Sequence, residues 1–187
     1  MTSALIEGSF VALITPMNAD GTIDFEGFRT LIQFHEENGT SAILFMGSTG
    51  EVSMLSQEER HAIVRETMKM RSGRMHFYYG CTGTTTAGTI DYVRQAGAEG
   101  ADGAIIAAPA YICASNADIV QFCLDVADAS PIPLGFYNNP PRVGTDLKTE
   151  DLLRIAEHPR FVVLKESTTR VGQVAQVCAA KPAMSLM

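Results

Sequence analysis

The sequence predicts an α/β fold in which parallel strands alternate with helices. Short runs rich in Val, Ile, Phe, Tyr and Ala recur along the 187 residues, and each is bounded by Gly, Pro or hydroxyl residues. Such runs are typical of buried parallel strands. Their starts lie 22 to 34 residues apart, which is room for one strand and one helix. A βα unit therefore repeats along the chain, and right-handed crossovers are expected to join its strands.

Seven strands are expected, one in each of these runs. They are predicted at residues 10–16, 42–47, 76–80, 103–109, 133–137, 161–165 and from 183 onward.

The segments between the runs have the pattern of amphipathic helices. Apolar residues within 25–35 fall at helical spacing, and the Asn-Gly pair a few residues later favours a left-handed stop. Ser56, with Glu59 three residues on, predicts a capping box that opens a second helix. Thr149 and the two acidic residues after it begin another helix, and Pro159 ends it.

Strict alternation of strand and helix leaves two main architectures, an open doubly wound sheet or a (β/α)8 barrel. Residues 15–21, after the first strand, lack the Gly-x-Gly-x-x-Gly pattern of a dinucleotide-binding sheet, and the sequence contains no Gly-x-x-x-x-Gly-Lys loop for phosphates. The repeat alone does not choose between the two. In both, ligands bind beyond the carboxyl ends of the strands, so functional side chains are expected there.

Composition limits the partners. Fourteen Lys and Arg stand against 21 Asp and Glu, a net charge of −7, so no excess of positive charge is available for phosphates. We therefore expect neither nucleic acid nor a membrane as a partner. The hydrophobic fraction of 46% suits a single domain over residues 1–187. No run approaches the roughly 20 apolar residues of a membrane span, and residues 1–7 do not resemble a secretory signal.

Cys81, Cys113, Cys123 and Cys178 are scattered singly, without partners at metal-ligand spacing. We interpret each as a small, buried apolar residue in its reduced form. A cytoplasmic protein without a metal site is expected.

Lys165 is the first unusual strand end, because it directly follows the apolar residues 161–164. An apolar surrounding disfavours the charged form of an amine, and a partly neutral amine can attack a ketone. The neighbouring Glu166 works the other way, since a close carboxylate favours the ammonium. A structural lysine that extends to solvent is the alternative interpretation of this position.

Three more strand ends carry groups suited to chemistry. Tyr137 ends the fifth run and Arg142 follows a Pro-Pro turn, so a phenol for proton transfer and a guanidinium for a carboxylate lie close in sequence. In the turn 47–50, two glycines flank Ser48 and Thr49, whose donors can converge on a small anion. Tyr111 follows the fourth run. The alternatives are a loop tyrosine, a surface arginine, an ordinary turn and an aromatic interface contact.

Together these four segments resemble the dihydrodipicolinate synthase and N-acetylneuraminate lyase family of pyruvate-dependent class I aldolases. The likeness runs from Gly8 to Ser167 with every motif in order. It implies the (β/α)8 TIM barrel, in the form of an incomplete barrel of about six and a half βα units. Because eight units of roughly 30 residues need about 240 residues, we expect the end of strand 7, strand 8 and the C-terminal helices to be missing.

The resemblance also implies roles for individual residues. Lys165 is similar to the lysine that forms a Schiff base with pyruvate, and Tyr137 to the proton shuttle. Thr49, with its N–H, matches the group that holds the pyruvate carboxylate. Ser48 stands where many members have a proton-relaying threonine. These two lie between the turn glycines Gly47 and Gly50.

Tyr111 matches a tyrosine that reaches into the site of a neighbouring subunit, which implies a homo-oligomer, either a dimer or a tetramer. Arg142 matches the arginine that binds the carboxylate of aspartate semialdehyde. The implied function is a Schiff-base-forming lyase that joins or cleaves pyruvate and an aldehyde, without metal or organic cofactor, and most like the dihydrodipicolinate synthases. The alternatives are a 2-keto-3-deoxy sugar-acid or 4-hydroxy-2-oxoglutarate aldolase or dehydratase of the same family, and a non-catalytic truncated paralogue.

The likeness weakens at several positions. Ala110 stands where dihydrodipicolinate synthases often have a second tyrosine. Gln57, Arg60, Thr85 and Thr89 align with the places that carry histidines, an asparagine and an acid in lysine-inhibited members. Feedback by lysine is therefore not expected.

Overall fold

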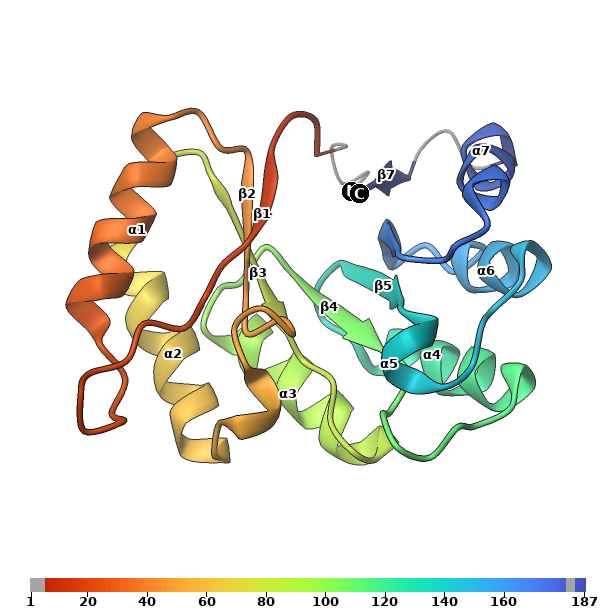
Figure 1. Cartoon of the computed structure of the whole chain (residues 1–187), viewed down its shortest axis with the longest axis horizontal. Coiled ribbons are helices and arrows are strands. Elements are labelled where there is room, and N and C mark those ends of the chain that lie inside the picture. Colours follow the sequence, from red (N-terminus) through yellow and green to blue (C-terminus); the bar gives the residue numbers. More distant parts are fainter. Residues whose placement is uncertain (1–5, 181–183) are drawn as a thin grey trace. The chain divides into compact units, whose positions relative to one another are not determined.

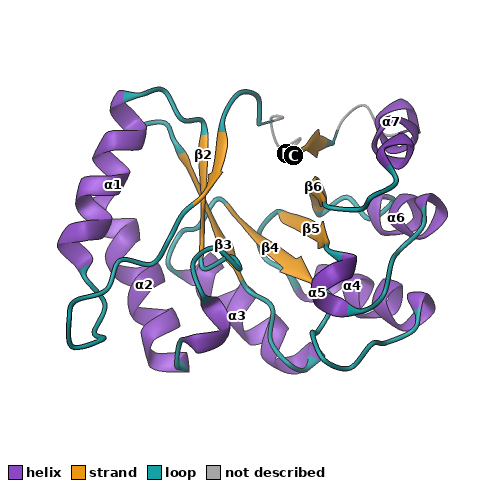
Figure 2. Ribbon diagram, in the orientation of Figure 1, coloured by secondary structure: helices purple, strands orange, loops and turns teal. Residues whose placement is uncertain are grey.

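The computed structural model describes residues 6–180 and 184–187. They form two compact units: the N-terminal unit, residues 6–80 and 95–103, and the C-terminal unit, residues 81–94 and the described part of 104–187. Each unit contains parallel strands with helices between successive strands (Figures 1 and 2). That residues 1–187 act as one domain stays a prediction.

The N-terminal unit is built on three strands, which pair in parallel in chain order. They are β1 (Phe10–Ala12), β2 (Ala42–Phe45) and β3 (His76–Gly80). All four residues of β2 are buried, as expected for a central strand covered on both faces. Two neighbouring helices pack beside these strands (Figure 1), and a short 3-10 helix precedes the second of them. They are α1 (Phe25–Glu37), η1 (Val52–Met54) and α2 (Gln57–Met70).

Aromatic rings fill the core of the N-terminal unit. The ring centroid of Phe45 on β2 lies 5.8 Å from that of Phe28 on α1, and 5.1 Å from those of Phe77 and Tyr79 on β3. All four side chains are fully buried. Burial of such a side chain stabilises the fold by roughly 1.5–3 kcal/mol, so the contact of Phe28 with Phe45 helps to hold α1 against the strands.

In the C-terminal unit, strands again pair in parallel in chain order. They are β4 (Gly103–Ala107, with residues 104–107 in this unit), β5 (Leu134–Asn138), β6 (Phe161–Glu166) and β7 (Ser185–Leu186). Of the helices, α6 lies between α4 and α7 and contacts both. The helices are α3 (Thr86–Ala98, of which residues 86–94 belong here), α4 (Asn116–Ala129), α5 (Pro140–Val143), α6 (Thr149–Ala156) and α7 (Val171–Ala180).

The seven predicted strands are confirmed as elements, although several differ in their ends. β1 ends at Ala12 rather than at residue 16, and β4 at Ala107 rather than at 109. Both predicted runs were extended to a proline, which has no N–H to offer a strand partner, and both prolines lie outside the strands. β2 ends early because Met46 adopts a left-handed backbone with φ 53°. The start of the last strand, predicted at residue 183, lies outside the described residues.

The helix signals are confirmed as well. Ser56 and Glu59 form the expected capping box, with hydrogen bonds of 3.2 and 2.8 Å. Gly39, after α1, has φ 74°, which is the left-handed stop. α6 begins at Thr149, as predicted. The expected Pro-Pro turn at residues 140–143 is instead the one-turn helix α5, because prolines fit the first turn of a helix.

Cys81 and Cys123 are buried, and burial raises the pKa of the Cys123 thiol well above its ordinary value. The expectation of burial is wrong for Cys113 and Cys178, which are exposed. Cys113 lies in the loop after β4 and Cys178 on the outer face of α7. None of the four forms a disulfide within the described residues. Over the same part of the chain, the helices are too short or too polar to cross a bilayer.

Candidate active site

The ends of β5 and β6 bring Tyr137 and Lys165 side by side. In this parallel pair, Tyr137 is the register partner of Lys165, and Asn138 is that of Glu166. The Nζ atom of Lys165 lies 4.5 Å from the centroid of the Tyr137 ring. Both residues are partly exposed, so a small molecule can reach them. This contact places the Lys165 amine over the phenol ring.

A bulge sets this pairing. Leu134 is opposite Phe161, but the next residue, Gly135, is opposite Val163, so Val162 has no partner on β5. Without the extra residue in β6, Tyr137 would face the residue before Lys165 and the two side chains would point to opposite faces of the sheet. The sequence contained no signal for this bulge.

The hydroxyl of Tyr137 is oriented by Asn139. The Nδ2 of Asn139 donates to the Tyr137 Oη at 2.7 Å, and the Ser167 Oγ lies 3.5 Å from the same oxygen, which is a long contact. Asn139 is buried. A phenol oxygen that accepts a hydrogen bond still has its own proton to donate, so this arrangement leaves Tyr137 able to act as an acid. Sequence reasoning assigned no role to Asn139.

The part of β6 that precedes Lys165 is apolar and largely buried in the structure, as predicted. Phe161, Val163 and Leu164 are all buried. Among the described residues, the Lys165 amine forms no ion pair, and the carboxylate of Glu166 is engaged elsewhere. The amine thus lies against the ring of Tyr137 and forms no ion pair with an acid of the described residues.

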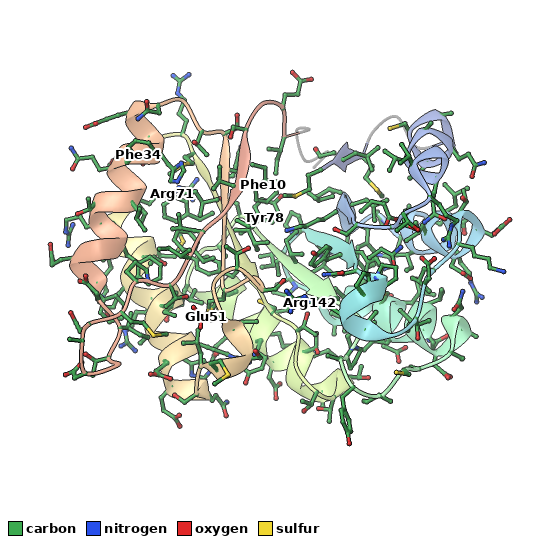
Figure 3. The ribbon with its side chains drawn as sticks, in the orientation of Figure 1. Phe10, Phe34, Glu51, Arg71, Tyr78 and Arg142 are labelled. Atoms are coloured by element: carbon green, nitrogen blue, oxygen red, sulfur yellow. The ribbon has the colours of Figure 1, made fainter. Side chains whose placement is uncertain are left out.

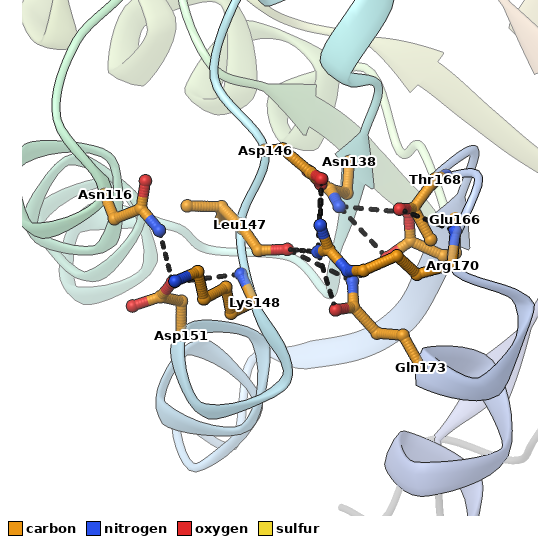
Figure 4. A network of polar contacts seen from close by, with 10 residues as sticks. All are labelled: Asn116, Asn138, Asp146, Leu147, Lys148, Asp151, Glu166, Thr168, Arg170 and Gln173. Atoms are coloured by element: carbon orange, nitrogen blue, oxygen red, sulfur yellow. Dashed lines mark hydrogen bonds and ion pairs between the residues drawn. The ribbon is translucent and has the colours of Figure 1, made fainter.

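A polar network surrounds Glu166 (Figure 4). Its carboxylate accepts hydrogen bonds from the Asn138 amide, the Gln173 amide and the Thr168 N–H. Arg170 in turn donates to the Gln173 Oε1 at 2.8 Å. Arg170 also donates to Asp146 and to the Leu147 carbonyl. A separate set of hydrogen bonds joins Asp151 to Asn116 and to the Lys148 N–H.

Arg142 lies in α5, the short helix that begins directly after Asn139. Its side chain is exposed (Figure 3). Among the residues the structure describes, its guanidinium has no carboxylate partner. It can therefore bind a carboxylate of a ligand in bidentate fashion.

Tyr111 lies in the loop after β4 and is 99% exposed. Its backbone has φ 77°, a left-handed conformation that is rare for a bulky residue. The ring of Tyr111 thus has no packing role within the described part of this unit.

The predicted anion-binding turn, residues 47–50, belongs to the N-terminal unit. Ser48 and Thr49 are exposed. In the described part of the chain, the N–H groups of these two residues donate no backbone hydrogen bond. Two hydroxyls and two N–H groups are thus available in one turn, which is the chemistry that a carboxylate requires.

Two features hold this turn in shape. The Oγ1 of the buried Thr15 donates to the Gly50 carbonyl at 2.7 Å. Met46 and Glu51, on either side, have φ of 53° and 55°, which costs roughly 1–3 kcal/mol at each non-glycine residue. Strain of this kind often accompanies a functional turn. Thr15 lies within the span of the family likeness, residues 8–167, but no role was predicted for it.

The structure therefore brings Lys165 and Tyr137 together and places Arg142 and Tyr111 in the same unit, whereas the turn 47–50 lies in the other unit. The roles predicted for these residues stay predictions.

Parallel strands that alternate with helices, with a lysine beside a tyrosine at two strand ends, define a βα-repeat protein with a lysine-centred site. The family model described as the dihydrodipicolinate synthetase family matches residues 5–186. The chain belongs to this family, and the family resemblance found in the sequence is confirmed.

Curated relatives and solved structures agree with this assignment. The chain is 36% identical over 177 residues to the 4-hydroxy-tetrahydrodipicolinate synthase of Gluconacetobacter diazotrophicus, with 95% of this chain and 60% of the relative covered. It is similar, with a TM-score of 0.91 and 34% identity, to the chloride-inhibited dihydrodipicolinate synthase of Acinetobacter baumannii in complex with pyruvate, covering 97% of this chain and 62% of that one. The corresponding values are 0.92, 30%, 98% and 63% for a prophage protein of the same family from E. coli K12, also in complex with pyruvate.

These likenesses confirm the predicted fold class, an α/β fold of the (β/α)8 barrel family in the form of an incomplete barrel. They also show that the chain spans about 60% of the length of the curated relatives it matches.

Proposed function

We propose that this chain carries the lysine-centred site of a Schiff-base-forming lyase, most like 4-hydroxy-tetrahydrodipicolinate synthase, that joins or cleaves pyruvate and an aldehyde. The observation that carries the proposal is the Lys165 Nζ lying 4.5 Å from the Tyr137 ring at the ends of two paired strands. Support comes from the relative named as a synthase and from the two similar structures that contain pyruvate.

In the proposed reaction, the neutral amine of Lys165 attacks the keto carbon of pyruvate to give a carbinolamine. Tyr137 donates a proton to the oxygen that leaves as water, and an iminium bond to Lys165 forms. The iminium draws electrons from the neighbouring methyl carbon, which loses a proton to the Tyr137 phenolate, so that the phenol is restored and an enamine forms. The enamine carbon then attacks the aldehyde, and a proton from Tyr137 reaches the new alkoxide. The protein-bound iminium is the electron sink, so we propose no metal or organic cofactor.

Other residues bind and orient in this proposal. Asn139 holds the Tyr137 hydroxyl at 2.7 Å. The exposed turn 47–50 offers hydroxyl and N–H donors suited to a carboxylate. The roles of Thr49 in holding the pyruvate carboxylate and of Ser48 in relaying protons stay predictions. The exposed Arg142 would bind a carboxylate on the second substrate.

Tyr111 supports a further part of the proposal. Its ring is 99% exposed, which suits a side chain that enters the site of a second copy in a homo-oligomer, either a dimer or a tetramer. We also propose that the protein is cytoplasmic.

A sugar-acid aldolase or dehydratase of the same family is the second candidate. The exposed guanidinium of Arg142 supports it equally, because such substrates also carry a carboxylate. Assays that pair pyruvate with aspartate semialdehyde and, separately, with hydroxyaldehydes distinguish the two. A non-catalytic paralogue that only assembles with longer copies would be recognised by mixed oligomers in native mass spectrometry.

Borohydride reduction in the presence of pyruvate, followed by peptide mass mapping, tests the proposed function. We expect a reduced pyruvyl adduct on Lys165, and none in the Lys165→Ala variant. The absence of an adduct on a chain shown to be folded would refute the lyase proposal. Equal trapping in the Lys165→Ala variant would show that another amine is the nucleophile.

A further inference from the structure

Glu166 directly follows Lys165 in the chain, yet its carboxylate lies on the other face of β6. Successive residues of a strand point to opposite faces. Lys165 shares its face with Tyr137, and Glu166 shares the opposite face with Asn138. Gln173 of α7 also reaches the carboxylate, so Glu166 points towards the helix layer.

Donors surround the Glu166 carboxylate (Figure 4). Its Oε1 accepts from the Asn138 Nδ2 at 3.0 Å and from the Thr168 N–H at 2.8 Å. Its Oε2 accepts from the Asn138 Nδ2 at 3.1 Å and from the Gln173 Nε2 at 3.1 Å. Asn138 is 2% exposed and Gln173 4%. A carboxylate has about four acceptor positions, and these contacts occupy them.

A second set of contacts determines which way the Gln173 amide points. Arg170 donates through its Nη2 to the Gln173 Oε1 and to the Leu147 carbonyl, both at 2.8 Å, and it forms an ion pair with Asp146. Because the oxygen of Gln173 faces Arg170, its Nε2 is left to donate to Glu166 and, at 3.1 Å, to the Leu147 carbonyl. The reverse orientation would place two donors together.

The position of this carboxylate matters for the neighbouring amine. An opposite charge within about 4–6 Å favours the charged form of a group, and an ammonium has no lone pair with which to attack a ketone. The ring of Tyr137 on β5 lies against the Lys165 amine. On the other edge of β6, the paired residues of β7 are Ser185 and Leu186, neither of which titrates. The charged groups near Glu166 on its own side are Arg170 and Asp146.

We propose that Asn138 and Gln173 are positioning residues that hold the Glu166 carboxylate on the helix side of β6, so that the amine of Lys165 faces a phenol ring and not an acid. The inference rests on the proposed function, since it assumes that Lys165 acts as a nucleophile. It explains how a lysine and a glutamate that are neighbours at one strand end do not form an ion pair.

Competitive labelling of Lys165 with acetic anhydride, followed by peptide mass spectrometry, tests the inference without any pyruvate. Labelling over about pH 6 to 11 reports the neutral fraction of the amine. Asn138→Leu removes two of the four hydrogen bonds to Glu166. We expect its labelling midpoint to rise by about one pH unit, because the released carboxylate turns towards the amine.

A second substitution separates positioning from simple support of the fold. The double variant Asn138→Leu with Glu166→Gln lacks the carboxylate, so its midpoint should return to that of the wild type. If Asn138 only stabilised the strands, the labelling midpoint of the double variant would be the same as that of the single variant. Gln173→Met, which removes the other side-chain donor, should shift the midpoint in the same direction by a smaller amount, and it decides the question if Asn138→Leu does not fold.

Asn116→Ala is the matched control. It removes the 2.6 Å hydrogen bond between Asn116 and Asp151 in the same unit, so it should lower stability without moving the midpoint. An unchanged midpoint in folded Asn138→Leu or, where that variant does not fold, in Gln173→Met overturns the inference. So does a shift that persists after Glu166→Gln is added.

The same variants separate the inference from the proposed function. Asn138→Leu should trap pyruvate about tenfold more slowly at pH 7, which is the loss of neutral amine for one pH unit. A folded wild-type chain in which acetic anhydride labels Lys165 but pyruvate is never trapped would refute the proposed function. The labelling midpoints of the variants would still decide the role of Asn138 and Gln173.

Discussion

Lys165 and Tyr137 are partners in the β5–β6 register, and the amine of the first lies 4.5 Å from the ring centroid of the second. The relationship depends on the bulge at Val162, since an unbulged pairing would place Leu164 opposite Tyr137. Both side chains thus come from backbone that is held by the hydrogen bonds of the sheet. Groups on paired strands are held more precisely than groups on loops.

Removal of the phenol oxygen alone should slow imine formation. Tyr137→Phe keeps the ring over which the Lys165 amine lies and loses the hydroxyl that Asn139 orients. A positioned acid or base contributes roughly 10²–10⁴-fold, so the rate of trapping in rapid-quench experiments with borohydride should fall by a factor in this range while the adduct still forms on Lys165. Tyr137→Leu, which lacks both ring and hydroxyl, is the comparison. An unchanged rate in Tyr137→Phe would remove Tyr137 from the mechanism.

Substitution of Arg142 should affect the second substrate most. Arg142→Lys keeps the charge but loses the planar pair of donors, and a hydrogen bond to a charged group contributes about 1.5–3 kcal/mol. We therefore expect KM for an aldehyde with a carboxylate to rise tenfold or more, and by much more than KM for pyruvate. The measurement is steady-state kinetics with each substrate varied in turn. Equal changes in KM for the aldehyde and KM for pyruvate would show that Arg142 does not bind the carboxylate of the second substrate.

A side chain at position 135 should disturb the bulge. The Cβ atom of an alanine there would lie 2.3 Å from the Ile105 Cδ1 and 2.9 Å from the Val163 Cβ. Overpacking typically costs about 1–3 kcal/mol, so Gly135→Ala should lower the free energy of unfolding in urea by this amount and slow pyruvate trapping.

Gly172→Ala provides the control for this substitution. Gly172 lies in α7, its added Cβ would meet nothing within 4 Å, and alanine favours a helix by roughly 0.5–1 kcal/mol. This variant should be slightly more stable than the wild type. A Gly135→Ala chain as stable and as reactive as Gly172→Ala would show that the strands tolerate the extra atom.

Tyr78 should make the stability of the N-terminal unit fall at alkaline pH. The centroid of its ring lies 5.2 Å from that of Phe10 (Figure 3). Burial, together with the charge of Asp102, raises the pKa of Tyr78 from 10.0 to about 12. The folded chain therefore binds the phenol proton more tightly than the unfolded chain does. This contribution is complete below about pH 10 and is lost as the pH rises from about 10 to 12.

Tyr78→Phe tests this effect, because phenylalanine does not titrate. Two pKa units correspond to about 2–3 kcal/mol, so the wild type should lose this much stability relative to Tyr78→Phe between pH 9 and about pH 12. Urea unfolding at a series of pH values measures the difference. A difference that stays constant over this range would show that folding does not raise the pKa of this phenol.

Local sequence signals predicted much of the framework. The capping box of Ser56 and Glu59 and the left-handed stop at Gly39 depend on residues within a few positions of each other, and the structure contains both. Strand ends were less well predicted. The early end of β2, for example, results from the left-handed Met46, a residue with no special preference for that conformation.

The residues of the candidate site also fall into two groups, those that the sequence could predict and those that it could not. Lys165 and Tyr137 could be recognised because each follows an apolar strand, and a reactive group at a strand end is a pattern along the chain. Asn138, Asn139, Gln173 and Thr15 could not, since an amide or hydroxyl has a role only through its partner. Their partners are Glu166, Tyr137, Glu166 and Gly50 respectively.

The amino-acid order alone therefore determined which strands and helices form and which side chains stand at the strand ends, because hydrophobic periodicity and capping act over short distances. Tertiary structure decided the bulge at Val162 that sets Tyr137 opposite Lys165, and the donors that turn the Glu166 carboxylate away from the amine. Both depend on atoms that are far apart in the chain and become neighbours only when the strands pair and α7 packs against them.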